Sequence, residues 1–92
     1  MIVRIATEGQ YRLADDVLAR VNALDNEVVA AVEAQDEGRF AELFGQLIAL
    51  IRAEGSPLSE DELQGSDVIV PPPDTSLEEA RSDFSGDGLI PD

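Results

Sequence analysis

The amino-acid sequence contains no cysteine, no histidine, no lysine and no tryptophan. Because there is no cysteine, no disulfide can form, and the hydrophobic core alone must hold the fold together. The thiol, imidazole and amine groups on which most nucleophilic, proton-transfer and soft-metal chemistry depends are absent as well. We therefore expect a protein that is not an enzyme, that needs no cofactor or metal, and whose role is to contact another protein.

Basic side chains are also scarce. Six residues of the Lys and Arg class, all of them arginine, stand against 20 Asp and Glu, so the formal net charge is −14. A field of this sign repels phosphate backbones and anionic lipid headgroups. The charge therefore argues against nucleic acid as a partner and against direct membrane insertion, and it favours a partner with basic patches.

Aromatic residues and long apolar runs are few. Aromatic residues make up 4% of the chain, so aliphatic side chains must fill most of the core. No segment is long and apolar enough to span a bilayer, and the start Met1–Ile5 lacks the basic and apolar regions of a signal peptide. We expect a single cytoplasmic domain over residues 1–92.

Alternating apolar and polar residues open the chain. Val3 and Ile5 would lie on one face of a strand over Ile2–Ala6, and a similar alternation follows over Gln10–Leu13. The dipeptide Glu8-Gly9 between the two segments is a turn signal. The pattern predicts an N-terminal β-hairpin.

Two amphipathic helices are predicted next. The first should begin at Asp15 or Asp16, whose carboxylate would accept from the first-turn N–H groups, and run to about Ala34. The second should begin at Asp36, and Gly55 with Pro57 should end it, so the short connection predicts an αα-hairpin. The apolar stripes comprise Val17, Leu18, Val21, Leu24, Val28, Val29 and Val32 in the first helix, and Phe40, Leu43, Phe44, Leu47, Ile48, Leu50 and Ile51 in the second.

Residues 56–92 differ in character from the preceding part. They hold all five prolines, and their charged residues are almost all acidic. The apolar, β-branched run Asp67–Val70 predicts a short edge strand added to the hairpin, and Pro71–Pro73 should end it. Ser76 with Glu79 three residues later is a capping-box pattern that predicts a short helix over Leu77–Phe84.

Together these elements predict an α+β fold. An N-terminal β-hairpin plus a short third strand would pack on an αα-hairpin, with a short C-terminal helix. Residues 1–55 would form the hairpin and the two-helix core, and residues 56–92 an acidic, Pro-containing C-terminal segment that wraps the outside.

Asp25 is the candidate partner-binding residue. On a helical wheel it falls inside the apolar arc of the first helix, between Leu18 and Val32. A buried carboxylate needs a polar partner. Two interpretations stay open: Asp25 lies at the edge of the stripe or pairs with Arg4 or Arg12, or it makes a polar contact within a binding surface.

Other motifs have plainer alternatives. Asp83–Ile90 resembles the first half of an EF-hand calcium loop, but position 12 falls beyond Asp92, so a turn that ends a helix is favoured. The acidic runs Glu60–Glu62 and Glu78–Glu79 are interpreted as solvated faces or helix N-terminal charges rather than catalytic pairs. Pro71–Pro73 fits a rigid connector better than a polyproline ligand. The apolar arc of the second helix fits a central core better than a groove for a partner helix.

Several short strings, in this order, carry a family resemblance: Ile2-Val-Arg-Ile5, Glu8-Gly-Gln-Tyr11, Leu24-Asp25, Ser66-Asp-Val-Ile-Val-Pro71, Ser76-Leu-Glu-Glu79 and Gly88-Leu-Ile-Pro91. Together they resemble the PspA-associated domain family, PspAA, over nearly the full chain. The resemblance implies a small accessory protein encoded beside phage-shock protein A (PspA), the coiled-coil protein that guards the bacterial inner membrane under envelope stress. It implies no catalytic residue and assigns no binding residue.

We therefore expect a non-enzymatic accessory protein that binds PspA, or a related membrane-associated coiled-coil protein, in the phage-shock response. It would be cytoplasmic and recruited to the inner face of the membrane through its partner. The alternative is a self-associating module in which edge strands or faces of the second helix pair in a homodimer.

Overall fold

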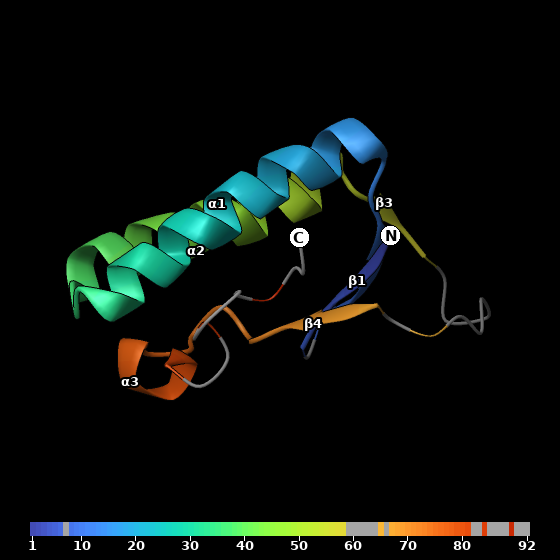
Figure 1. Ribbon diagram of the computed structural model, residues 1–92. Helices are drawn as coiled ribbons and strands as arrows, with labels where there is room; N and C mark the ends of the chain where they lie inside the picture. The colour runs from blue at the N-terminus through green and yellow to red at the C-terminus, as the bar shows by residue number, and fades with distance from the viewer. Residues whose placement is uncertain (7, 59–64, 66, 82–83, 85–88, 90–92) are drawn as a thin grey trace.

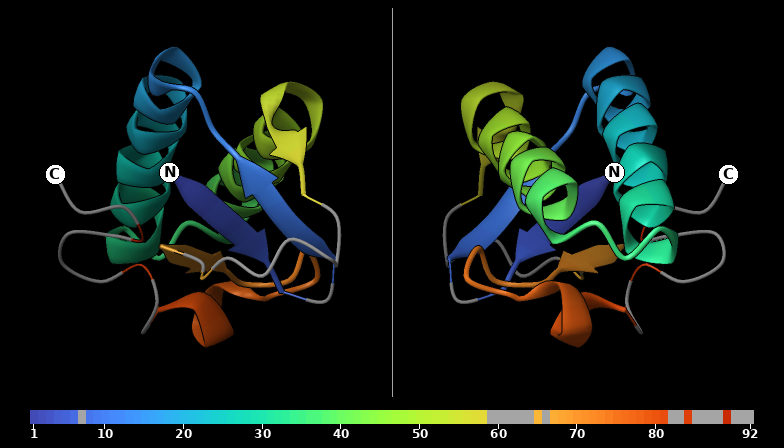
Figure 2. Two further views of the ribbon diagram at one scale, coloured as in Figure 1. Left: turned by 90° about the vertical axis from the view of Figure 1, so that its right-hand side faces the viewer. Right: turned by 90° about the vertical axis from the view of Figure 1, so that its left-hand side faces the viewer.

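Two long helices cover one face of a small mixed β-sheet in the computed structural model, which describes residues 1–6, 8–58, 65, 67–81, 84 and 89 (Figures 1 and 2). This arrangement confirms the predicted α+β fold. In chain order the elements are β1 (Ile2–Ile5), β2 (Gly9–Arg12), α1 (Asp15–Glu33), α2 (Glu37–Glu54), β3 (Ser56–Pro57), β4 (Val68–Val70) and α3 (Leu77–Ala80).

The strands lie in the order β3-β2-β1-β4. β1 and β2 pair antiparallel as the predicted hairpin, and β4 joins β1 in parallel as the predicted further strand. β3 is not among the predicted strands, because Pro57 is expected only to end the preceding helix. Proline has no N–H to donate, but at the edge of a sheet it can pair on one side without that donor. Accordingly, Ser56 and Pro57 pair with β2.

The alternation predicted for β1 is confirmed. Val3 and Ile5 are fully buried and belong to the same hydrophobic core as the buried side chains of α1 and α2. Arg4 between them is exposed, because successive side chains of a strand point to opposite faces.

The start of α1 corrects one prediction. The N-cap residue is Ala14, and no side chain caps it. Asp15 and Asp16 lie instead in the first helical turn, where their charges complement the positive end of the helix dipole. The helix begins where expected, but the predicted cap by Asp15 or Asp16 is wrong.

A tight turn joins α1 to α2. Gln35 has a φ of 57°, the left-handed conformation common just after a helix. Its N–H donates to the Val32 carbonyl and the Asp36 N–H donates to the Ala31 carbonyl, both at 3.0 Å. Asp36 then caps α2, because its Oδ1 accepts from the Arg39 N–H at 3.1 Å. The predicted αα-hairpin is confirmed, and α2 begins at Glu37, directly after the predicted start at Asp36.

α2 ends at Gly55 as predicted, but for a different reason. Gly55 has φ −76° and ψ 152°, which is extended backbone open to any residue. A Cβ at this position would lie 2.5 Å from the Ile51 carbonyl oxygen and 3.0 and 3.1 Å from side-chain atoms of Tyr11 and Leu13. Glycine is required here because the end of the helix meets β2 with no space for a side chain.

The core lies between the helix pair and the sheet, and it extends under the C-terminal segment. Phe40 and Phe44 of α2 stack with ring centroids 5.3 Å apart. Phe84, fully buried, presents edge-to-face contacts to both rings at 6.2 and 5.7 Å. The apolar arc of α2 is therefore central core, as predicted: its buried residues are Phe40, Leu43, Phe44, Leu47, Ile48 and Ile51.

Two ion pairs link elements at the surface. The Arg52 guanidinium in the last turn of α2 donates to both carboxylate oxygens of Glu8 in the β1–β2 turn, at 2.9 and 2.5 Å. These bonds to Glu8 raise the pKa of Arg52 above its usual value. Arg20 of α1 pairs with Glu54 of α2. Since both pairs are largely solvated, they fix orientation more than they add stability.

Candidate functional site

Ile69 in β4 is the exposed large hydrophobic side chain of the described residues, at 60% exposure. Its neighbours Val68 and Val70 are buried, on the side of the sheet that α1 and α2 cover. Because side chains alternate along a strand, Ile69 points away from the helices. An exposed apolar side chain on an edge strand is a candidate for contact with another molecule.

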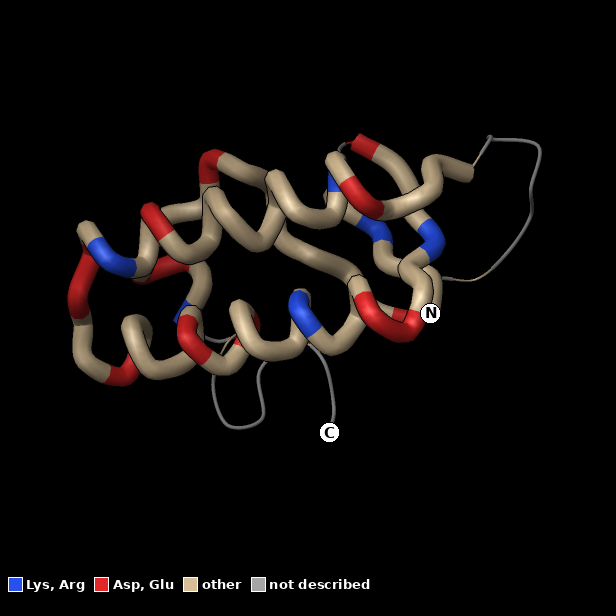
Figure 3. Tube along the Cα trace, turned by 90° about the horizontal axis from the view of Figure 1, so that it is seen from above, with Lys and Arg blue, Asp and Glu red and all other residues tan. Residues whose placement is uncertain are grey.

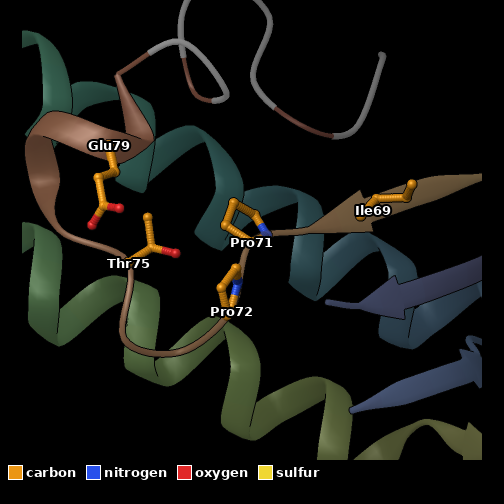
Figure 4. Close-up of a pocket in the computed structure, with 5 residues that line it drawn as sticks. All are labelled: Ile69, Pro71, Pro72, Thr75 and Glu79. Carbon is orange, nitrogen blue, oxygen red and sulfur yellow. The ribbon is translucent and has the colours of Figure 1, made fainter. Parts of the chain in front are cut away.

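A hollow of about 540 Å³ lies beside Ile69. We call it the Ile69 hollow; its lining residues are Ile69, Pro71, Pro72, Thr75 and Glu79. In Figure 4 Ile69 lies at one end, Thr75 and the Glu79 carboxylate lie at the other, and the rings of Pro71 and Pro72 lie between them. The surface therefore combines an apolar end with an anionic end.

Backbone pairing fixes the apolar end. The Asp67 N–H donates to the Ile2 carbonyl at 2.8 Å, and the Ile2 N–H donates to Asp67 Oδ2 at 2.9 Å. β4 then runs in register with β1, with Ile69 opposite Arg4. Pro71 and Pro72 follow directly, and their fixed φ angles restrict the backbone beyond the strand. Ile69 is thus held by the sheet on one side and by a stiff connector on the other.

Helix α3 fixes the anionic end. It lies beneath the end of the helix pair at which α1 passes into α2 (Figure 1). The Ser76 N–H donates to Glu79 Oε1 at 3.1 Å, and the Glu79 N–H donates to Ser76 Oγ at 3.3 Å, which is the predicted capping box. The bond from the Ser76 backbone lowers the pKa of Glu79 below its usual value. Glu79 is therefore a positioned anion at neutral pH.

The extent of α3 differs from the prediction. The helix ends at Ala80, not at Phe84, although the Phe84 N–H still donates to the Ala80 carbonyl at 3.0 Å. The buried side chains Ala80 and Phe84 lie four residues apart and anchor this part of the chain. The anchoring holds Glu79 and Thr75 in place beside Pro71 and Pro72.

A second hollow lies on the outer face of the helix pair. It has a volume of about 510 Å³ and is lined by Arg20, Ala23, Leu24, Gln46, Ala49 and Leu50. Its walls are mainly small or half-buried apolar side chains, and Arg20 is engaged with Glu54. Acidic residues are scattered along both helices rather than gathered at one point (Figure 3). This face offers a shallow groove without a distinctive polar group of its own.

Asp25, the predicted partner-binding candidate, is fully buried in the core face of α1. Its Oδ1 accepts a hydrogen bond from the Leu89 N–H at 3.0 Å. It therefore lies within the apolar stripe, not at its edge, and it anchors the C-terminal segment. A role of Asp25 in partner binding stays a prediction.

The remaining motifs either have a structural role or lie outside the described residues. The EF-hand-like stretch Asp83–Ile90 is described only at Phe84 and Leu89, and the run Glu60–Glu62 lies wholly outside the described residues. Glu78 and Glu79 are first-turn charges of α3, as predicted. Pro71–Pro73 connects β4 to α3. Among the described residues no group of three or more His, Cys, Asp or Glu is placed to hold a metal ion.

No described helix is both long enough and apolar enough to cross a membrane.

Comparison with known protein families shows to which family the chain belongs. The family model for PspA-associated proteins, PspAA, matches residues 1–92. The chain belongs to this family. No curated protein and no solved structure matches it significantly.

The Ile69 hollow is a feature of this PspAA-family chain that sequence reasoning missed. Val68, Ile69 and Val70 look alike in the sequence, and the run predicts only an edge strand. The available signal was the strand's own periodicity: if Val68 and Val70 face the core, Ile69 must face solvent. The convergence of Thr75 and Glu79 on the same place has no local signal, because it depends on how α3 docks.

Proposed function

We propose that the protein is a non-enzymatic accessory protein that binds PspA in the bacterial envelope-stress, or phage-shock, response. The observation that carries the proposal is the family match over residues 1–92, since the name of the family implies association with PspA. The side-chain chemistry agrees with a binding role: the sequence offers carboxylates, arginines and aliphatic groups, and lacks histidine, cysteine and lysine.

In this proposal the protein works in the cytoplasm and reaches the inner face of the membrane through its partner. Its charge of −14 opposes direct contact with anionic lipid, so a protein must supply the link. The same charge would accelerate encounter with a basic patch on the partner. Because the acidic residues are spread over both helices (Figure 3), this field would steer the approach, and a defined contact surface would supply specificity.

Titration of purified PspA into the purified protein, followed by calorimetry, tests the proposal. We expect binding that weakens as the salt concentration rises, because screening removes the steering and the surface ion pairs. Absence of binding at both low and high salt would refute the assignment of PspA as the direct partner.

Self-association is the second candidate. The observation in its favour is that β3 and β4 are the outer strands of the sheet in the described chain, and open strand edges can pair between copies. Against it, two copies of charge −14 repel each other. Multi-angle light scattering on the pure protein distinguishes the two candidates: a concentration-independent dimer mass would establish the homodimer.

A further inference from the structure

We propose that the Ile69 hollow binds a partner segment in which a large apolar side chain lies next to an arginine or lysine. The apolar side chain would pack on Ile69, Pro71 and Pro72, and the cation would pair with Glu79. The proposal rests on the proposed function in one respect, that PspA supplies the segment; the chemistry of the hollow itself is read from this chain.

The apolar end is suited to one large side chain. Ile69 is 60% exposed, and Pro71 and Pro72 beside it are half-buried, so together they form a firm apolar floor. Covering this floor removes apolar area from water without reorganising the protein, because the sheet and the proline backbone already hold it.

The anionic end selects the charge of the neighbouring group. Glu79 Oε1 accepts the Ser76 N–H at 3.1 Å, so the carboxylate is oriented before any partner arrives, and the second oxygen can accept from an incoming cation. A positioned carboxylate costs less side-chain ordering than a mobile one when an ion pair forms. Thr75 in the same wall adds a hydroxyl that can donate or accept.

Charge also decides between possible occupants. A second copy of this chain would bring a charge of −14 against a charge of −14, and nucleic acid or an anionic lipid surface would be repelled in the same way. A basic segment of another protein is attracted both by the whole molecule and by Glu79. The occupant that fits is therefore a basic, partly apolar protein segment.

Three short peptides test the chemistry directly. One carries leucine beside arginine, the second has glutamate in place of that arginine, and the third has serine in place of that leucine. Each is titrated into isotopically labelled protein while backbone amide NMR signals are followed. We expect the first peptide to shift the amides of Ile69, Thr75 and Glu79 in a saturable way, and the other two to bind at least roughly tenfold more weakly.

Matched variants test the residues. Ile69→Ser and Glu79→Gln should each weaken the first peptide several-fold, while Ile69→Val should bind as the wild type does. Glu78→Gln is the charge control, because it removes the same charge from the same helix without altering the lining of the hollow. Thermal unfolding of each variant checks that the fold is retained, and Glu79→Gln keeps an oxygen that can accept the Ser76 N–H.

The same variants with PspA separate the two proposals. If PspA binds the wild type and is weakened by Ile69→Ser and Glu79→Gln but not by Glu78→Gln, both proposals are supported. If PspA binds all four proteins equally, the hollow is not its site and only this inference fails. If the peptides bind in the hollow but PspA does not bind at all, the proposed function fails and the inference about the hollow stands. Peptide shifts confined to the groove lined by Ala23 and Ala49 would overturn the inference.

Discussion

Asp25 in the middle of α1 holds the chain near its C-terminal end: its Oδ1 accepts the N–H of Leu89 at 3.0 Å. The two residues are 64 positions apart in the sequence, and Asp25 has no exposed surface. A carboxylate placed among valines costs stability unless hydrogen bonds offset its desolvation. The hydrogen bond from the Leu89 N–H offsets part of this desolvation.

Replacing Asp25 with alanine should loosen the C-terminal segment. Without the acceptor, the Leu89 N–H loses its partner in a partly buried site, which costs about 1–3 kcal/mol. We expect a lower free energy of unfolding in urea and faster hydrogen exchange at the Leu89 amide. Asp25→Asn is the control, because it keeps an acceptor oxygen of the same shape, and it should lose less. Unchanged exchange at Leu89 in Asp25→Ala would contradict the anchoring role.

Phe84 should be a major stabilising contact of the C-terminal segment. It is fully buried and packs edge-to-face on Phe40 and Phe44. Phe84→Ala should reduce the free energy of unfolding by about 3–5 kcal/mol through lost burial and the cavity left behind. Phe84→Leu should cost less, since most of the volume remains. Unfolding followed by circular dichroism measures both changes in the free energy of unfolding. If Phe84→Ala lowered this free energy no more than a substitution at an exposed position does, Phe84 would not be the contact that holds this part of the chain.

Two glycines of the α2 region should respond to alanine in opposite directions. At Gly55 a Cβ would lie 2.5 Å from the Ile51 carbonyl oxygen, so Gly55→Ala should destabilise the protein by about 1–3 kcal/mol. At Gly45, in the exposed helix interior, a Cβ meets nothing within 4 Å, so Gly45→Ala should stabilise by up to about 1 kcal/mol. Thermal unfolding of both variants is the measurement. Equal shifts of the same sign would show that space is not what requires Gly55.

Local patterns in the sequence were enough to predict most of the fold. The period-two alternation at Val3 and Ile5, the helical stripes and the start of the second helix at Asp36 each depend on residues within a few positions of one another. The cap of the first helix was predicted wrongly and strand β3 was not predicted, both for local reasons. Ala14 precedes Asp15 and takes the cap position without a capping side chain, and Pro57 can end a helix and also pair at a sheet edge.

The candidate site could not be predicted in the same way, because it depends on long-range packing. Asp25 was identifiable as unusual, but its hydrogen bond with the Leu89 N–H was not, because the two residues lie 64 positions apart in the sequence. The Ile69 hollow is lined by Ile69 of β4 and Glu79 of α3, and three prolines lie between these two residues in the sequence. The burial of Ala80 and the packing of Phe84 on Phe40 and Phe44 hold the helix residue in place.

The capping box of α3 should make local stability depend on pH in the acid range. The Ser76 backbone N–H lowers the pKa of Glu79 relative to the unfolded chain, so the stabilisation is fully present above the usual pKa of a glutamate and is lost as the pH falls through the lowered value. An NMR titration of the Ser76 amide should therefore show a transition with a midpoint below the usual glutamate range. In Glu79→Gln the acceptor remains but cannot titrate, so this transition should disappear. A midpoint at or above the usual range would mean that the Ser76–Glu79 bond does not persist in solution, and the Ile69 hollow would then lack a positioned anion.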